Sequence, residues 1–230
     1  MNSHDAIARK FENYFQNARM TSSYKPVMLL SILYHIKQRK STYLPSANIY
    51  FISLNDIALF FLKFYFYTLK YYDLNHLTNK NNKIGIYRII EKYFRDFNTF
   101  PEYLNHKIIT KTINQLFRNV IFLLLNDIYL YDFYDEQFQE FRLPHEFIGK
   151  DDFRVVIKNK KIRVEEIKYL GIKESAYLYL SLNYTNLKKK INLNLIQFLK
   201  KVNYSFDSFD EIDRFYDNLS NLKNMMSDSN

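Results

Sequence analysis

The residues that interrupt regular secondary structure are scarce in this chain. Its 230 residues include three glycines and four prolines, which are the strongest sequence signals for turns and loops. We therefore expect long regular elements, most of them helices. Hydrophobic residues make up 47% and aromatic residues 18% of the chain, which is too apolar for an intrinsically disordered protein. The length is enough for one large domain or two small ones.

Apolar residues recur at helical spacing through the first half of the chain. Residues 5–19 are amphipathic, residues 24–38 are apolar almost throughout, and an aromatic segment runs from 55 or 56 to 72. This last segment contains Lys63 and is too short to cross a bilayer, so we expect a buried core helix and no membrane as partner. Further helices are predicted over 86–96, 108–125, 132–141, 187–201 and 209–226, with 41–53 as a connection.

A β-hairpin is predicted near residues 153–165. β-Branched residues lie on both sides of the short polar turn 158–160, which is a hairpin pattern. The predicted fold class is therefore mainly α, a multi-helix bundle with a small β-hairpin near 153–165.

The clearest internal boundary lies between Pro144 and Gly149. Proline and glycine close together mark loops and turns, and the charge balance also changes at this point. We predict a helical domain over 1–145 and a second unit over 150–230, made of the basic hairpin and C-terminal helices. One continuous domain is the alternative.

Basic residues are unevenly distributed along the chain. The net charge is +9, and residues 150–204 alone contain 13 basic and 5 acidic residues, a net of +8. The tail from residue 205 carries a net charge of −4. A basic segment of this density suits binding to a phosphate backbone. Lysine outnumbers arginine 23 to 10, and a solvated surface is the alternative interpretation of each basic cluster taken singly.

Three of these clusters are candidate nucleic-acid contacts. One ends the helix over 24–38, one forms the turn and second strand of the predicted hairpin, and one begins the helix over 187–201. A β-ribbon with lysines at its tip can follow a groove or the phosphate backbone. The candidate residues are Lys37, Arg39 and Lys40; Lys158, Lys160, Lys161 and Arg163; and Lys188, Lys189 and Lys190.

An enzymatic site is the alternative for the same region. Asp152 precedes the predicted hairpin, and Glu166 and Lys168 follow it, as in nucleases of the PD-(D/E)xK type. In such enzymes the carboxylates hold a divalent metal, and the lysine stabilises charge at the scissile phosphate. The proline of the fuller pattern is missing before Asp152. Mg²⁺ is the cofactor that this alternative needs, and no cofactor is predicted otherwise.

Several reaction classes lack the residues they need. The chain has no cysteine, which excludes disulfides and thiolate zinc sites and fits a cytoplasmic location. Three glycines in total exclude a glycine-rich phosphate loop. The five histidines are scattered without metal-ligand spacing, and His35 is expected in the core.

The segment Ser23–Leu30 consists of a serine, Tyr-Lys-Pro and four aliphatic residues. Pro26 suits the first turn of a helix, and Ser22 and Ser23 are candidate N-caps. Together with the preceding Phe11-x-x-Tyr14-Phe15, this segment resembles the N-terminal helical domain that precedes the catalytic module in many bacterial HNH endonucleases of the restriction type. Such domains continue with a helix-rich middle, a short basic β-containing stretch and a helix that leads into the HNH unit.

The resemblance spans residues 8–203, and residues 195–203 look like the helix that leads into the HNH unit. These 230 residues contain no HNH unit, because His145 is the only histidine beyond His106. The resemblance implies a DNA-binding or specificity component of a restriction system for antiviral defence. Its expected ligand is duplex DNA, and a nuclease partner subunit would supply cleavage. The alternatives are the PD-(D/E)xK-type nuclease and a helical protein–protein interaction scaffold whose acidic tail pairs with a basic partner.

Overall fold

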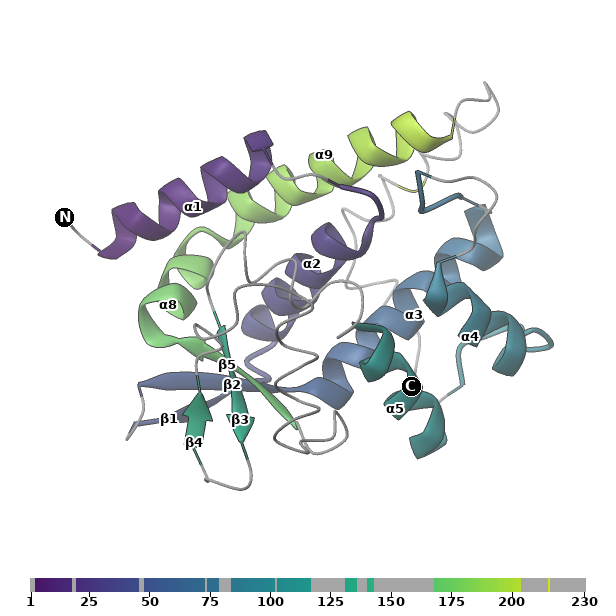
Figure 1. Ribbon diagram of the computed structural model, residues 1–230, viewed down its shortest axis with the longest axis horizontal. Coiled ribbons are helices and arrows are strands. Elements are labelled where there is room, and N and C mark those ends of the chain that lie inside the picture. The colour runs from purple at the N-terminus through teal and green to yellow at the C-terminus, as the bar shows by residue number, and fades with distance from the viewer. Residues whose placement is uncertain are drawn as a thin grey trace, which may run out of the picture.

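The computed structural model describes residues 3–17, 20–45, 48–72, 74–78, 84–101, 103–116, 131–135, 140–142, 168–203 and 215. Within these residues the fold is mainly α-helical, as the sequence predicts, with a small antiparallel sheet beside the helices (Figure 1). The hairpin predicted near 153–165 lies outside the described residues.

Helices form most of the described structure. The predictions for 5–19, 24–38, 55–72, 86–96 and 187–201 are confirmed to within a few residues at each end, whereas the helix over 174–182 was not predicted. For 108–125 the described part reaches residue 116, and for 209–226 it consists of Phe215 alone. The helices are α1 (Ser3–Asn17), α2 (Tyr24–Lys37), α3 (Leu54–Tyr72), α4 (Gly85–Tyr93), α5 (His106–Leu116), α8 (Glu174–Leu182) and α9 (Tyr184–Val202).

The sheet brings together strands that are far apart in the sequence. Its order is β1-β2-β5-β3-β4, and each neighbouring pair is antiparallel. In the centre, Tyr50 pairs with Ile172 and Ile52 with Leu170. The strands are β1 (Thr42–Leu44), β2 (Ile49–Ser53), β3 (Tyr131–Asp135), β4 (Glu140–Arg142) and β5 (Tyr169–Lys173).

Two sequence predictions are wrong in this sheet. Residues 41–53, predicted as a connection, form the β1–β2 hairpin, and residues 132–141, predicted as a short helix, contain most of β3 and of β4. The physical reason lies in the aromatic residues of both segments, which favour strands when a partner strand is available. That partner is β5, which pairs with both β2 and β3.

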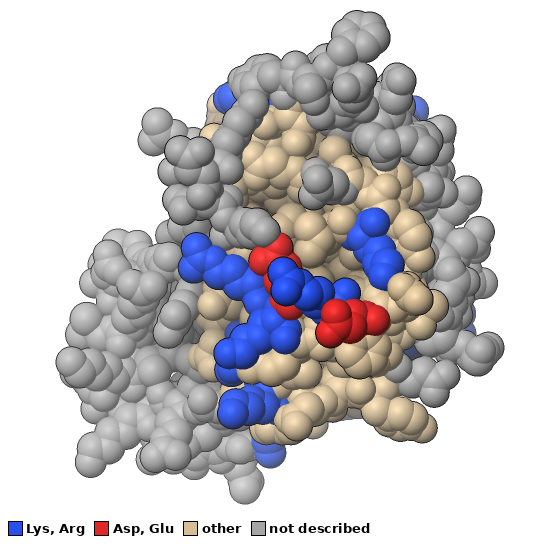
Figure 2. Space-filling model, turned by 90° about the vertical axis from the view of Figure 1, so that its right-hand side faces the viewer, with Lys and Arg blue, Asp and Glu red and all other residues tan. Residues whose placement is uncertain are grey.

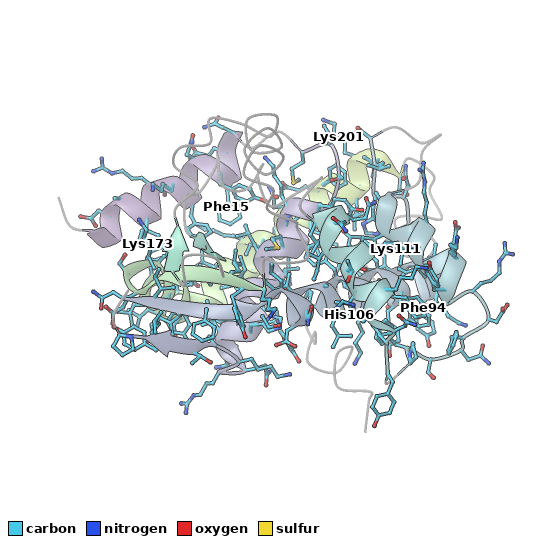
Figure 3. All side chains as sticks on the ribbon, turned by 60° about the horizontal axis from the view of Figure 1, so that its bottom comes forward. Phe15, Phe94, His106, Lys111, Lys173 and Lys201 are labelled. Carbon is cyan, nitrogen blue, oxygen red and sulfur yellow. The ribbon has the colours of Figure 1, made fainter. Side chains whose placement is uncertain are left out.

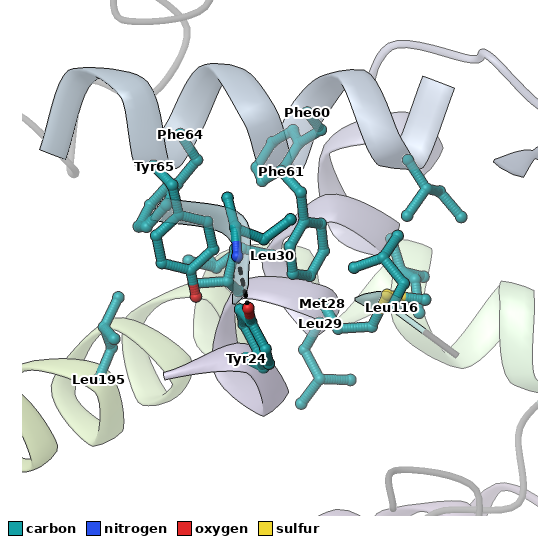
Figure 4. Close-up of a cluster of buried hydrophobic side chains, with 14 of the residues drawn as sticks. Tyr24, Met28, Leu29, Leu30, Phe60, Phe61, Phe64, Tyr65, Leu116 and Leu195 are labelled. Carbon is teal, nitrogen blue, oxygen red and sulfur yellow. Dashed lines mark hydrogen bonds between the residues drawn. The ribbon is translucent and has the colours of Figure 1, made fainter. Parts of the chain in front are cut away.

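The core surrounds α2, which is apolar on nearly every side. Twelve of its fourteen residues are buried, as expected for a helix without a polar face. Met28, Leu29 and Leu30 face the aromatic residues of α3, while Leu195 comes from α9 (Figure 4). Residues on both sides of the predicted boundary thus share one core and one sheet. No helix in the described parts of the chain has the length and apolar character to cross a membrane.

Candidate nucleic-acid interface

The first turn of α2 is held in place by a buried polar network. The Ser23 hydroxyl lies 2.7 Å from His76 Nδ1 and 2.8 Å from Tyr65 Oη. Ser23 occupies the N-cap position as predicted, but its side chain makes no capping hydrogen bond within the described residues. Its backbone N–H donates to the His76 carbonyl at 3.2 Å, so the segment around His76 is fixed against the start of α2.

The residues that carry the family resemblance are therefore structural. Tyr24 is buried, and its hydroxyl accepts a 3.0 Å hydrogen bond from the Ile86 backbone N–H (Figure 4). Burial raises the pKa of Tyr24. Lys25 and Pro26 are also buried, so this segment fixes α2 to α3 and α4 and is not exposed to a ligand.

The two histidines that are buried in the described structure, His35 and His76, also have structural roles. His35 is buried, as predicted, and its Nδ1 lies 2.7 Å from the Ser31 carbonyl, to which it donates if protonated there. Burial lowers the pKa of His35 and lowers the pKa of His76 to about 3. Within the described residues, no group of three His, Asp or Glu side chains is placed to hold a metal ion.

Two of the predicted basic clusters meet where α2 ends and α9 begins. Lys37 Nζ lies 5.4 Å from the centre of the Tyr184 ring, within the range of a cation–π contact. Tyr184 is the first residue of α9, and Lys188 follows it by one helical turn. This contact joins segments about 150 residues apart. We name the resulting surface the α2–α9 basic surface: Lys37, Arg39, Lys40, Lys188, Lys189 and Lys190.

A C-terminal cap of two hydrogen bonds fixes the backbone at the end of α2. The Arg39 N–H donates to the Ile36 carbonyl at 3.1 Å, and the Lys40 N–H donates to the His35 carbonyl at 3.0 Å. This is the Schellman pattern, which requires a left-handed residue that is usually glycine. Here the residue is Arg39, with φ of 54°. The cap therefore holds an exposed arginine at some cost in backbone strain.

The α9 part of the surface is strongly positive. The helix carries five lysines and no acidic residue. Lys189 and Lys190 are exposed, and Lys188 is half-buried, which lowers its pKa. Lys200 and Lys201 lie at the far end of α9, about 15 Å away at 1.5 Å per residue. They are therefore not part of the α2–α9 basic surface.

The remaining predicted site residues are mostly outside the described structure. This holds for Asp152, Glu166 and the hairpin residues Lys158, Lys160, Lys161 and Arg163. Lys168 is described and exposed, and its carbonyl accepts a 2.8 Å hydrogen bond from the Leu54 N–H at the start of α3. The nuclease alternative thus stays a prediction.

A further basic surface, which the sequence analysis missed, lies on α4, α5 and the loop after α4. Figure 2 views the side of the molecule on which α4 and α5 lie and shows Lys and Arg side chains gathered there, with acidic ones among them. In the sequence these residues are spaced like one face of a helix rather than in a run, which is the signal that could have revealed them. We name it the α4–α5 basic surface: Arg88, Lys92, Arg95, Lys107 and Lys111.

Tyr93 lies within this surface and is surrounded by lysines. Lys111 Nζ donates a hydrogen bond to the Tyr93 hydroxyl and lies 5.0 Å from the centre of its ring. Lys92 Nζ lies 5.8 Å from the same ring. The hydrogen bond from Lys111, with the charges of Lys92 and Lys107, lowers the pKa of Tyr93. Figure 3 labels Lys111 near His106 and Phe94 on this part of the molecule.

Comparison with models of known protein families, with curated proteins and with solved structures found no match.

Proposed function

We propose that the protein binds duplex DNA through the α2–α9 basic surface and acts as a DNA-binding or specificity component of a restriction-type system. The observation that carries this proposal is the contact between Lys37 and Tyr184, which unites two basic clusters from distant parts of the chain. Convergence of separate clusters on one surface favours a polyanionic ligand more than either cluster does alone.

The chemistry of such binding is contact with phosphates. Lysine ammonium groups contact phosphates as point charges, and the Arg39 guanidinium offers two parallel donors to one phosphate. Phosphate contacts set affinity and position along a duplex, whereas base contacts set sequence preference. Cleavage would be supplied by a partner nuclease subunit, and the role implies a cytoplasmic location.

Fluorescence anisotropy with a labelled duplex of about 25 base pairs, measured over a series of salt concentrations, tests the proposal. Phosphate contacts make log K fall with log salt, with a slope of roughly −0.9 for each neutralised phosphate. Replacing two exposed lysines of α9, Lys189→Gln with Lys190→Gln, should weaken binding about tenfold and reduce the slope by about two.

The matched control is Lys173→Gln with Lys201→Gln, which removes two exposed lysines from other parts of the molecule. We expect this pair to leave affinity within about twofold of the original protein. The proposal is wrong if the protein does not bind duplex DNA at low salt, as the scaffold alternative expects. Equal losses in the two double variants would also overturn it.

A further inference from the structure

Exposed aromatic side chains border the α4–α5 basic surface. In the described part of the chain, seven large hydrophobic side chains are exposed, and three of them are aromatic. These three, Tyr71, Phe97 and Tyr103, are 57%, 46% and 91% exposed, and all come from the end of α3 or from the loop between α4 and α5. The other four are leucines from α3, α8 and α9.

Hydrogen bonds connect the end of α3 to the loop that follows α4. Lys70 Nζ donates to the Phe97 carbonyl at 2.6 Å and to Asn98 Oδ1 at 3.2 Å. The Phe97 ring also contacts Phe94 edge-on, at 6.1 Å between ring centres. Phe97 therefore lies beside a fixed contact. Tyr71 follows Lys70 in the last turn of α3, and its ring stacks on that of Tyr67, at 5.8 Å between ring centres.

Tyr103 lies in the segment that leads into α5. The buried Phe100 lies three residues before it, and the partly buried Leu104 follows it directly. Asn105 then caps the start of α5, because its Oδ1 accepts a 2.8 Å hydrogen bond from the Lys107 N–H. The chain is thus held at Phe100 and at Asn105, while the Tyr103 ring is almost fully exposed, four residues before the first lysine of α5.

Exposed rings and cations together suit a nucleic acid whose bases are accessible. Aromatic side chains stack on unpaired bases, while lysine and arginine contact the backbone beside them. A duplex offers phosphates but keeps its bases paired and stacked inside, so exposed rings gain little from it. The combination on this surface therefore favours a single strand over a duplex.

We propose that the α4–α5 basic surface, with Tyr71, Phe97 and Tyr103 at its border, is a binding site for single-stranded nucleic acid. Tyr103 stacks on a base, and Arg88, Arg95 and Lys107 contact neighbouring phosphates. Lys92 and Lys111 keep their contacts with Tyr93 and add positive charge. This site is separate from the α2–α9 basic surface and does not depend on the duplex binding proposed there.

The absence of tryptophan from the chain allows a direct test of stacking. The Tyr103→Trp variant carries a single indole at the proposed stacking position. Titration with a 20-mer of thymidine nucleotides, and separately of uridine nucleotides, should quench its fluorescence and shift its emission maximum. Quenching by either strand supports the site, and the two arms tell DNA from RNA. The matched control is Leu182→Trp, at a position 77% exposed on α8, which should remain unquenched.

Anisotropy with labelled single strands provides the second measurement. Tyr103→Ala, at a position too exposed to affect folding, should weaken single-strand binding about tenfold and leave duplex binding unchanged. Arg95→Gln with Lys107→Gln should weaken it at least as much. The proposal is overturned if the protein binds no single strand at low salt, or if these variants bind it within twofold of the original protein.

The two binding proposals can fail separately. The variant with Lys189→Gln and Lys190→Gln should lose duplex affinity and keep single-strand affinity. If instead it loses single-strand binding while Tyr103→Ala keeps it, the single strand binds at the α2–α9 basic surface and the α4–α5 assignment is wrong.

Discussion

At the residue scale, a buried network joins the polar side chains of Ser23, His76 and Tyr65 within the core. The His76 Nε2 atom has no hydrogen-bond partner among the described residues. Protonating His76 would therefore place a charge in a site with no group to balance it, and this desolvation lowers its pKa to about 3. The network is consequently stable only with a neutral imidazole.

The stability of the protein should depend on pH through His76. Its pKa is about 3 in the folded protein and about 6.5 when unfolded, so the unfolded chain binds the extra proton between these values. The contribution of His76 is fully present above pH 6.5, and it falls by up to about 1.4 kcal/mol for each pH unit below that. Urea denaturation at pH 7, 6 and 5 should give a smaller loss in His76→Gln than in the original protein. The same comparison with the exposed His106→Gln should show no difference, and equal pH slopes in all three proteins would contradict the prediction.

Arg39 should lower the stability of the protein while adding a positive charge to the α2–α9 basic surface. Its left-handed conformation costs about 1 kcal/mol, which glycine would not incur. Arg39→Gly should therefore raise the free energy of unfolding by up to about 1 kcal/mol while weakening duplex binding. Arg39→Ala removes the same charge without relieving the backbone, so it is the matched control. Urea denaturation and anisotropy on both variants separate the two effects, and equal stabilities of the two would show that the cap is not strained.

At the scale of elements, α2 is the support on which the other helices pack. It contacts α3, α8 and α9, and its own residues are buried all round. The two ends of α2 lie in different environments. The first turn is buried against α3 and α4, whereas the last turn lies at the α2–α9 basic surface. A change in the middle of α2 should therefore affect folding without touching the basic residues.

Leu30→Ala is such a change. Leu30 is 1% exposed and lies in the cluster with α3, so its truncation should cost about 2–5 kcal/mol of unfolding free energy. Leu193→Ala, at a position 43% exposed on α9, should cost less than about 1 kcal/mol. Chemical denaturation of the two variants makes the comparison, and similar costs would argue against a central role for α2.

At the scale of the whole molecule, α3 packs against α2, which carries part of one basic surface, and against α4 and α5, which carry the other. His35 is within electrostatic range of both Lys40 and Asp56, so one surface lies near the first turn of α3. Lys70, which holds the loop after α4, lies in the last turn. Fourteen residues separate Asp56 from Lys70, a rise of about 21 Å.

This separation predicts that a duplex and a single strand bind at the same time. An excess of unlabelled thymidine 20-mer should leave the anisotropy of a bound labelled duplex unchanged or raise it, because a ternary complex tumbles more slowly. Unlabelled duplex serves as the competition control and should displace the label. Displacement by the single strand at matched phosphate concentration would mean that the two ligands share one surface.

Local patterns in the sequence were sufficient for most of the helices, α8 being the exception. Apolar spacing located α1, α2, α3, α4 and α9, because a helix is built from contacts between residues three or four apart. The even apolar character of α2 also indicated its burial. The same local reasoning failed for β3, whose pairing with β5 depends on a partner more than thirty residues away, and for β4, which pairs with β3.

For the candidate sites too, the sequence predicted some features and the tertiary structure alone determined others. The sequence by itself identified the basic residues at the end of α2 and the start of α9, since each cluster is a short run. Only the tertiary structure brought them together, because the packing of α9 on α2 places Lys37 against Tyr184. The α4–α5 basic surface depends wholly on tertiary structure: its charges become neighbours only when two helices and the loop after α4 pack on α3. Charges interact through space. The sequence determines which charged residues the chain contains, and the fold determines which of them lie close enough together to act on one ligand.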